Sequence, residues 1–502
     1  MSAADVAGWR RTSPLAAVFY LGRIYQAIAK NAVQSLAPLA AFVVAFRGDR
    51  LTAAIVAVSL LVVATLVHAF LRYWFFRFRV TPDSLLIRDG VFRKRQLDIR
   101  FERVQAINTT QNLVYRLFRL VTVNVDTAGA AGQEGHLPAV RHAVAEELRE
   151  RIRGAPRQAV ADEEAGVTRA PAETLLRLPL GEVVRIGLSS GRVFLALILV
   201  GPLLDWFGDR LGDIAEEEAV LELFGGAPPP PGTALLLTLA VVFAILLLLV
   251  LASIVGSVLR WYGYELYAEG DALRSHAGLL TRHEQSVQRV KVQCLHVIQN
   301  AVLRLFHRYR LRMRQAGGGL PGRASRFDVP IAGPDLPPRV AEFLFGDELG
   351  EAPLAPGSAR FVPIPRYYVR SRTVLLGFWP AVLGCIALAP AAGLGALLAL
   401  GWVPAVAGIA WLRHRRFGLV VTRDAMAFRK GFIGSRIVVW LHRKVQSVVI
   451  AQSPFQRRRG LATLRIHLAG EAVVVPFIDY AGAARLRDYV LYRVETSERA
   501  WH

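Results

Sequence analysis

The chain has 502 residues, with 61 lysines and arginines against 39 aspartates and glutamates, so its formal net charge is +22 at pH 7. Hydrophobic residues nevertheless make up 53% of the sequence, and the mean hydropathy is +0.36. This pairing excludes a disordered basic tail, which would be polar, and argues against a soluble nucleic-acid binder. It predicts apolar membrane segments that alternate with basic soluble segments. The two cysteines exclude a disulfide scaffold.

Stretches without charged residues predict six membrane spans arranged as three helical hairpins. The first hairpin joins 31–46 to 51–71, the second joins 193–204 to 233–259, and the third lies within 373–412. A helix rises about 1.5 Å per residue, so the last stretch is long enough to cross about two bilayer cores. Pro390, Gly393 and Gly395 allow a turn in its middle.

The charge of the loops predicts the orientation of these hairpins. Within the hairpin loops the basic residues are only Arg47, Arg50 and Arg210, and the loop 208–232 is acidic. Nearly all other basic residues lie between the hairpins or near the two ends of the chain. The positive-inside rule therefore predicts that both termini and the long segments between hairpins are cytoplasmic.

A similar soluble segment follows each predicted hairpin. Arg103-Val104-Gln105 aligns without gaps with Lys291-Val292-Gln293 and with Lys444-Val445-Gln446. This agreement in three copies indicates a repeated unit of one membrane hairpin and one soluble module. The glutamines suggest a structural role, such as bonding to turn or strand-edge backbone, and ligand contact is the less favoured alternative. The aligned glycines and glutamines are Gly90, Gly278, Gly431, Gln105, Gln293, Gln446, Gln111, Gln299 and Gln452.

Each module is expected to contain several antiparallel strands followed by one helix. In the first copy, alternating residues predict strands over 76–81, 84–87, 91–101 and 121–126, with Asp89-Gly90 as a hairpin turn, and helical spacing covers 141–152. The third copy repeats this order with a strand at 472–477 and a helix at 479–494, for which Asp479 is the expected N-cap. The second copy has no obvious acidic closing helix.

This combination of membrane spans, hairpin glycine, K/R-V-Q element and closing helix resembles the bacterial pleckstrin-homology-like (PH-like) membrane proteins of the YdbS/YdbT type, also called membrane-flanked domain proteins. The resemblance implies an α+β membrane protein with three repeats of a transmembrane helical hairpin followed by a PH-like β-sandwich or barrel with a C-terminal helix. It also implies a multi-pass protein of the bacterial inner (cytoplasmic) membrane.

The expected domain boundaries follow this repeat. Residues 1–71 form an N-terminal segment and the first hairpin, and 72–153 form the first module. A linker at 154–190 leads to the second hairpin at 191–259 and the second module at 260–345. A second linker at 346–372 leads to the third hairpin at 373–412 and the third module at 413–496.

The sequence offers no motif for catalysis, and we expect neither an enzyme nor a cofactor. The pattern Gly317-x-Gly319-x-x-Gly322 is not followed by a helix, as a dinucleotide site requires. There is no His-Glu-x-x-His or Cys-x-x-Cys element for a metal and no Gly-x-Ser-x-Gly element for a nucleophile. His68 is the only ionisable residue within a predicted span, which argues against a transporter.

Two groups of basic residues are candidates for binding. The first group follows the predicted spans, where it either fixes the topology only or also meets anionic lipid headgroups. The second group lies inside the modules, and we favour a role in capping the open end of the β-sandwich over contact with the membrane or an acidic partner. The first group is Arg72, Arg77, Arg79, Arg260, Arg413, Arg415 and Arg416, and the second is Arg93, Lys94, Arg95, Arg116, Arg119, Arg457, Arg458 and Arg459.

The function expected from these features is that of a non-enzymatic integral membrane scaffold. Its three cytoplasmic PH-like modules would bind anionic lipids, a membrane-protein partner or one another, including as a homo-oligomer, and nucleic acid is not an expected partner. The alternative is an accessory component of an export or envelope-stress (antimicrobial-peptide defence) system that acts with a transporter.

Overall fold

The computed structural model describes residues 8–17, 20–22, 24–25, 50–90, 94–101, 104–127, 135–154, 173–190, 200–202, 204, 233–315, 326–358 and 360–497. Within these residues, three helical segments are long and apolar enough to cross a membrane: Ile55–Phe75, Thr238–Trp261 and Tyr367–Arg416. The first two lie in helices α3 (Arg50–Phe75) and α10 (Thr233–Trp261). The predicted spans at 31–46 and, except for its last residues, 193–204 lie outside the described residues.

The third membrane segment folds back on itself as a hairpin. Trp402 donates its indole N–H to the carbonyl oxygen of Leu376 at 2.9 Å, which ties the returning limb to the first one. The chain turns at Gly393, whose φ of +53° suits glycine, while Pro390 stays inside the outgoing helix. The limbs are α13 (Tyr367–Arg372), η5 (Thr373–Phe378) and α14 (Trp379–Ala392), followed by η6 (Gly393–Gly401) and α15 (Trp402–Arg416).

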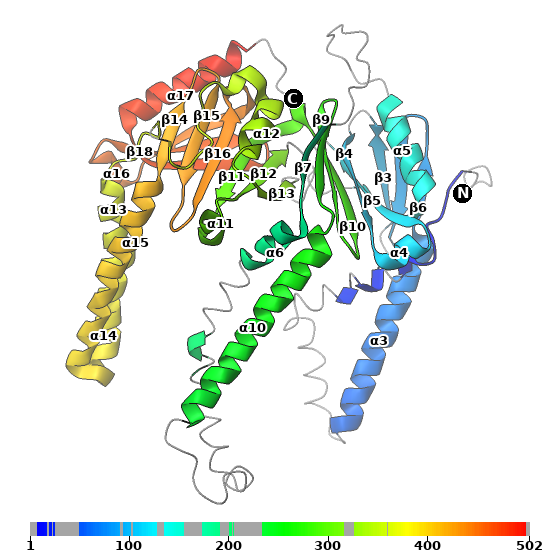
Figure 1. Cartoon of the computed structure of the whole chain (residues 1–502), viewed down its shortest axis with the longest axis horizontal. Helices are drawn as coiled ribbons and strands as arrows, with labels where there is room; N and C mark the ends of the chain where they lie inside the picture. Colours follow the sequence, from blue (N-terminus) through cyan, green and yellow to red (C-terminus); the bar gives the residue numbers. More distant parts are fainter. Residues whose placement is uncertain are drawn as a thin grey trace, which may run out of the picture.

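The strands form four antiparallel sheets, and two of these sheets cross from one module into the next (Figure 1). The seven-stranded sheet joins the second half of module 1 to the first half of module 2, with the order β6-β5-β4-β10-β9-β8-β7. The six-stranded sheet joins modules 2 and 3 in the same way, with the order β13-β12-β11-β16-β15-β14. The two remaining sheets are β1-β2-β3 and β17-β18-β19.

The strands have the following bounds. Module 1 contains β1 (Arg77–Val80), β2 (Ser84–Asp89), β3 (Arg95–Arg100), β4 (Val104–Gln111), β5 (Leu120–Thr127) and β6 (Gly135–Arg141). Module 2 contains β7 (Glu173–Arg177), β8 (Glu265–Glu269), β9 (Ala272–Ala277), β10 (Arg282–Gln288), β11 (Val292–Gln299), β12 (Tyr309–Gln315) and β13 (Arg326–Ala332). Module 3 contains β14 (Gly418–Val421), β15 (Ala425–Lys430), β16 (Ser435–Leu441), β17 (Val445–Ala451), β18 (Leu461–Leu468) and β19 (Glu471–Asp479).

The two junctions between modules have the same register. At the first junction β4 pairs with β10, and Gln111 lies opposite Arg282. At the second junction β11 pairs with β16, and Gln299 lies opposite Ser435. The repeat places Gln299 at the position of Gln111 and Ser435 at the position of Arg282, so one mode of strand pairing is used twice.

A helix closes each module on the side away from the membrane segments (Figure 1). These helices are α5 (His142–Gly154), α12 (Leu336–Phe345) and α17 (Tyr480–Glu495). Asp479 caps α17 by accepting a hydrogen bond from the Gly482 N–H at 2.9 Å. The second module does have a closing helix, which the sequence analysis missed because α12 is apolar and begins at Leu336-Pro337-Pro338 rather than at an acidic turn.

Part of each expected linker belongs to a module. Residues 173–188, assigned by sequence to the linker 154–190, form β7 and helix α6 (Leu180–Leu188), and β7 completes the seven-stranded sheet. In the linker 346–372, Val362 pairs with Leu419 of β14, and Arg10 pairs in the same way with Phe78 of β1. Each unit therefore begins with a strand segment before its membrane hairpin, and composition alone does not reveal this.

The hydrophobic cores also cross the junction between modules 2 and 3. The core of module 3 contains Cys294 of β11 together with Val438, Trp440 and Ile466. The opposite face of the same sheet places Ile437 in the core of module 2. Both faces of β11 and β16 are therefore buried, and strand pairing at the two junctions joins the three modules into one array.

Candidate membrane-contact surface

Three short helices occupy the same position in the three modules. They are α4 (Leu113–Leu117), α11 (Ala301–Leu305) and α16 (Pro454–Arg457). Asn112 and Asn300 begin the first two, because each side-chain oxygen accepts a hydrogen bond from the backbone N–H three residues later at 2.7 Å. Ser453 begins α16 through a capping box with Gln456.

Each short helix buries one side chain and exposes large apolar side chains. The buried residues are Tyr115, Leu303 and Gln456. In contrast, Leu117 is 79% exposed, Leu305 is 75% exposed and Phe455 is 68% exposed. The buried residue of each helix is compatible with the capping role that we favoured from the sequence, whereas Leu117, Leu305 and Phe455 are left exposed.

Helices α4 and α16 lie beside the ends of their membrane segments, whereas α11 lies next to α6 (Figure 1). Tyr115 of α4 packs in one cluster with Ala69 and Tyr73 of α3. In the third module, the Arg459 guanidinium, two residues beyond α16, lies 5.5 Å from the ring centroid of Tyr367, where α13 begins.

The second module reaches its membrane helix through α6. Asn300 at the start of α11 donates its side-chain N–H to the carbonyl oxygen of Ser189 at 2.8 Å. Ser253 of α10 donates to the carbonyl oxygen of Gly187 at 2.9 Å. Gly187 permits this approach, because a Cβ at this position would lie 2.7 Å from the Cα of Ile254.

Two strand turns extend the apolar surface. Leu279 and Leu280 are exposed in the β9–β10 turn, and the Leu279 N–H donates to the carbonyl oxygen of Leu259 in α10 at 3.0 Å. Phe432 and Ile433 are exposed in the equivalent β15–β16 turn. We call α4, α11, α16 and these two turns the membrane-facing rim. Exposed apolar patches of this kind, flanked by polar residues, mark interaction or membrane sites.

Basic residues accompany the apolar side chains of the rim. Arg116, Arg119, Arg304, Arg457, Arg458 and Arg459 are all exposed. Of the other module residues named from the sequence, Lys94 and Arg95 are exposed at the start of β3, and Arg93 lies outside the described residues.

The arginines that follow the membrane segments divide into two sets. Arg260, Arg413 and Arg415 are exposed, and Arg415 lies over the Trp411 ring at 4.0 Å. Arg72 instead pairs with Asp89 at 3.4 Å. The half-buried members of the group are Arg72, Arg77, Arg79 and Arg416. Of these seven arginines, the three that are exposed are therefore best placed to meet lipid headgroups.

The repeated glutamines bind backbone. The side-chain N–H groups of Gln111, Gln299 and Gln452 each donate to the carbonyl oxygen nine residues later, at 2.9, 3.3 and 2.8 Å. In the other set, Gln293 is buried and Gln446 is exposed, while the side chain of Gln105 lies outside the described part.

The repeated glycines lie in strand turns. Gly90 and Gly278 both have φ of +114°. A Cβ would lie 1.9 Å from the Thr281 carbonyl oxygen at Gly278 and 2.1 Å from the Gly434 carbonyl oxygen at Gly431. These turns therefore require glycine.

Lysines of the K-V-Q elements reach back across the junctions. The Nζ of Lys444 donates to the carbonyl oxygen of Val290 at 2.5 Å, and the Nζ of Lys291 donates to that of Val104 at 3.3 Å. Lys444 is 1% exposed, and burial lowers its pKa to about 8. The repeated lysine thus ties each module to the preceding one.

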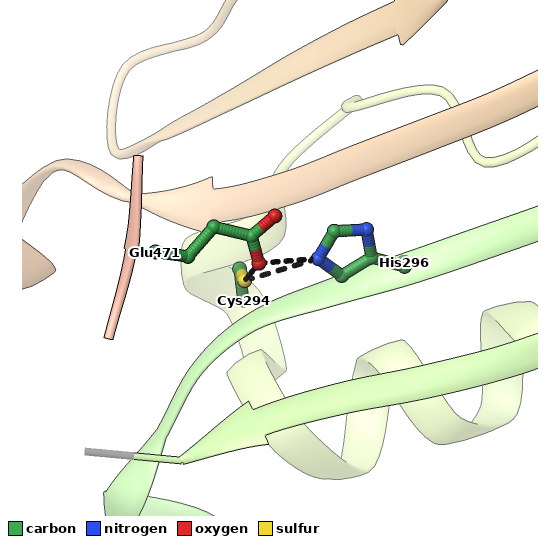
Figure 2. Close-up of side chains that lie close together, drawn as sticks. All are labelled: Cys294, His296 and Glu471. Atoms are coloured by element: carbon green, nitrogen blue, oxygen red, sulfur yellow. Dashed lines mark hydrogen bonds and ion pairs between the residues drawn. The ribbon is translucent and has the colours of Figure 1, made fainter. Parts of the chain in front are cut away.

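The junction between modules 2 and 3 holds a buried polar cluster that sequence motifs did not reveal (Figure 2). Cys294 and His296 lie on the same face of β11, and Glu471 comes from β19. The Oε2 of Glu471 lies 2.7 Å from the Nε2 of His296 and 3.4 Å from the Sγ of Cys294. The Cys-x-His spacing was the only signal, because Glu471 is far away in the sequence.

The charges around this cluster favour a structural contact over a metal site. Cysteine, histidine and glutamate are zinc ligands, but Arg314 already lies 3.2 Å from the Oε2 of Glu471. Burial raises the pKa of the Cys294 thiol and lowers the pKa of His296, so both are neutral near pH 7. Burial alone would raise the pKa of Glu471, but the hydrogen bond from His296 and the charge of Arg314 lower it. The result is an ionised carboxylate that accepts hydrogen bonds from His296 and Cys294 and forms an ion pair with Arg314.

Comparison with known proteins identifies the repeat. The family described as "Bacterial PH domain" matches residues 32–155, 233–345 and 375–494. The chain is also similar to the UPF0699 transmembrane protein YdbT of Bacillus subtilis (strain 168), with 22% identity over 442 residues, which cover 82% of this chain and 83% of that relative. Together with the membrane-length helices, these matches identify the chain as a membrane protein that belongs to the bacterial PH domain family and carries three copies of its domain.

Proposed function

We propose that the chain is a non-enzymatic scaffold of the bacterial inner membrane, anchored by three helical hairpins and with its PH-like modules and both termini in the cytoplasm. The contact of Trp402 with Leu376 supports the third hairpin, and the first two would pair α3 and α10 with the apolar stretches 31–46 and 193–204. The orientation is supported by the basic residues of the modules and the acidic loop 208–232.

The modules would rest on the inner leaflet through the membrane-facing rim. The observation that carries this proposal is the exposure of Leu117, Leu305 and Phe455 on the short helix that follows β4, β11 or β17 in each module. Exposed apolar side chains among arginines suit the interface between headgroups and acyl chains. Each arginine near an anionic surface would add about 1 kcal/mol of attraction.

Lipid contact can be tested on the full chain in nanodiscs, by attaching an environment-sensitive fluorophore to single cysteines. Leu117→Cys, Leu305→Cys and Phe455→Cys are the test positions, and Glu150→Cys on the exposed face of α5 is the control. All variants carry Cys385→Ala, because Cys385 is not fully buried. We expect nitroxide-labelled lipid to quench the three rim positions and to leave position 150 bright.

The preference for a lipid headgroup is measured by fluorescence quenching in the same nanodiscs. The nitroxide is placed on phosphatidylglycerol or on phosphatidylcholine at equal mole fraction, and we expect stronger quenching by the anionic lipid. Replacing Arg457, Arg458 and Arg459 with alanine should remove that preference at position 455 and preserve it at position 117. Equal quenching by both lipids in the parent protein would refute anionic-lipid binding, and bright rim positions would refute contact with the membrane.

A further inference from the structure

We infer that the chain self-associates head to tail, with strand β17 of one copy pairing to strand β3 of a second copy. This inference deepens the proposed scaffold function, on which it rests, by naming the partner of the modules. Its starting point is the two sheet edges that the internal junctions leave unpaired in the described part of the chain.

The repeat gives every module the same two junction strands. The strand that reaches forward is β4 in module 1, β11 in module 2 and β17 in module 3. The strand that receives it is β3 in module 1, β10 in module 2 and β16 in module 3. Inside the chain β4 pairs with β10, and β11 pairs with β16. Within the described part of the chain, β17 and β3 each have a sheet neighbour on one side only.

The burial of the forward strand shows which residues a second neighbouring strand would cover. Nearly every residue of β11 is buried, whereas β17 has only Val445 buried and exposes Gln446, Ser447 and Val449. Gln293 is completely buried at the junction, and its counterpart Gln446 is exposed. The same strand is therefore covered in one module and bare in the other.

Burial of the receiving strand varies between the modules. All but one residue of β16 are buried, whereas the paired strand β10 buries only Val287 and β3 buries only Ile99, so the free edge of β3 is identified by its pairing and not by its burial. Val438 of β16 is 0% exposed in the core of module 3. Its counterpart Leu97 packs only partly buried against the core of module 1.

The chemistry of the two edges favours a specific partner. The bare strand β17 reads Val-Gln-Ser-Val-Val-Ile-Ala, which has no charge and is rich in β-branched residues. Proteins normally protect an open sheet edge with charges, proline or a bulge, since a bare edge of this kind recruits other strands. The edge of β3 carries Arg95, Asp98 and Arg100, which discourage pairing with another β3.

The internal junctions predict the register of the new pair. Gln111 opposite Arg282 and Gln299 opposite Ser435 both correspond to Gln452 opposite Lys94. His296 opposite Val438 corresponds to Val449 opposite Leu97. The membrane segments leave the array on one side (Figure 1), so continuing the same step would keep the next copy on the same membrane. Such a head-to-tail contact closes into a ring or extends as a chain.

Cysteine cross-linking of the full chain in native membranes tests the pair and its register. Directly opposed residues of an antiparallel pair lie about 4.5–5.5 Å apart between Cα atoms, which suits a disulfide. We expect two differently tagged copies of Leu97→Cys/Val449→Cys to form a disulfide-linked species that contains both tags. The control Leu97→Cys/Ile450→Cys should form none, because a shift of one residue turns the side chain to the other face.

Two single-site variants complete the test. Val449→Lys should abolish association of the full chain in a mild detergent, measured by light scattering, while Val474→Lys at an exposed position of β19 should preserve it. Absence of the mixed-tag species, cross-linking of Val449→Cys alone, or persistence of the oligomer in Val449→Lys would overturn the inference. The fluorophore measurements at the rim are independent, so a monomer that still touches lipid would refute self-association alone.

Discussion

The Nε2 of His296 and the Oε2 of Glu471 lie 2.7 Å apart and connect the second module to the third. His296 comes from β11, whose two faces contribute to the cores of both modules. Glu471 begins β19, the last strand of the sheet that packs against β11. The contact is nearly dry, because the His296 side chain is 3% exposed and the Glu471 side chain is 16% exposed. It therefore links the stability of one module to the position of the next.

Replacing this carboxylate should destabilise the array. Glu471→Gln removes the charge that holds His296 and Arg314, and a buried donor that loses its acceptor costs about 1–3 kcal/mol. We expect a lower midpoint of thermal unfolding in detergent. The matched control is Glu265→Gln, because Glu265 lies 3.5 Å from the half-exposed His276 and 2.6 Å from the exposed Arg177, where water can replace the lost contacts, so the midpoint should change little. A midpoint for Glu471→Gln as high as that of the control would contradict the structural role.

Lys444 predicts a dependence of stability on alkaline pH. Burial and the charge of Arg443, partly opposed by Glu348, lower its pKa in the folded chain to about 8, whereas an unfolded lysine titrates at about 10.4. Between these values the unfolded chain binds more protons, so the contribution of Lys444 to the free energy of unfolding rises with pH from about 8 to about 10.4. Denaturant unfolding of Lys444→Met at several pH values should show a smaller rise than the parent. The exposed Lys94→Met should keep the parent's slope, and identical slopes for all three proteins would argue against this assignment.

The repeated glutamines should differ in importance according to their burial. Gln299 is 8% exposed, and Gln299→Leu would leave the carbonyl oxygen of Arg308 without its side-chain donor beside the junction. We expect a loss of about 1 kcal/mol in the free energy of unfolding. Gln452 makes the same bond at an exposed position, where water can replace the donor, so Gln452→Leu should cost less. The opposite order would show that burial does not set the strength of this contact.

The hairpin glycine should not tolerate a side chain. Gly278→Ala would place a Cβ 1.9 Å from the carbonyl oxygen of Thr281, so the β9–β10 turn would have to move. The control is Gly270→Ala, which also has a positive φ of +59° but meets no atom within 4 Å. We expect both variants to lower the thermal midpoint and Gly278→Ala to lower it by clearly more. Equal losses would mean that φ alone, and not the crowded turn, requires glycine.

Local patterns predicted the parts of the fold that depend on local chemistry. The turn at Asp89-Gly90, the strand that became β5 and the helix capped by Asp479 follow from alternation, turn residues and capping, which are readable in one stretch of sequence. The three-copy alignment predicted the repeat that the family match bears out. The predicted partner helices of the first two hairpins remain predictions.

The relationships between modules could not be read in this way. Strand pairing uses main-chain N–H and C=O groups that every residue except proline carries, so the sequence of β11 does not indicate that β16 is its neighbour. For the same reason, the sequence of β11 did not reveal that both of its faces are buried. Glu471 and His296 meet only because two sheets pack together, and the outward direction of Leu117 depends on a turn between two strands.

Main-chain pairing at the junctions also explains how the copies have been able to diverge. The residue opposite the forward strand is His283 at one junction and Arg436 at the other, facing Thr110 and Ile298. The imidazole of His283 differs in shape from the guanidinium of Arg436, and the polar Thr110 corresponds to the apolar Ile298, yet the ladder keeps its register because its bonds do not involve the side chains. An ancestral gene could therefore have lengthened by whole units while each copy accumulated substitutions, without inventing a new interface at every duplication.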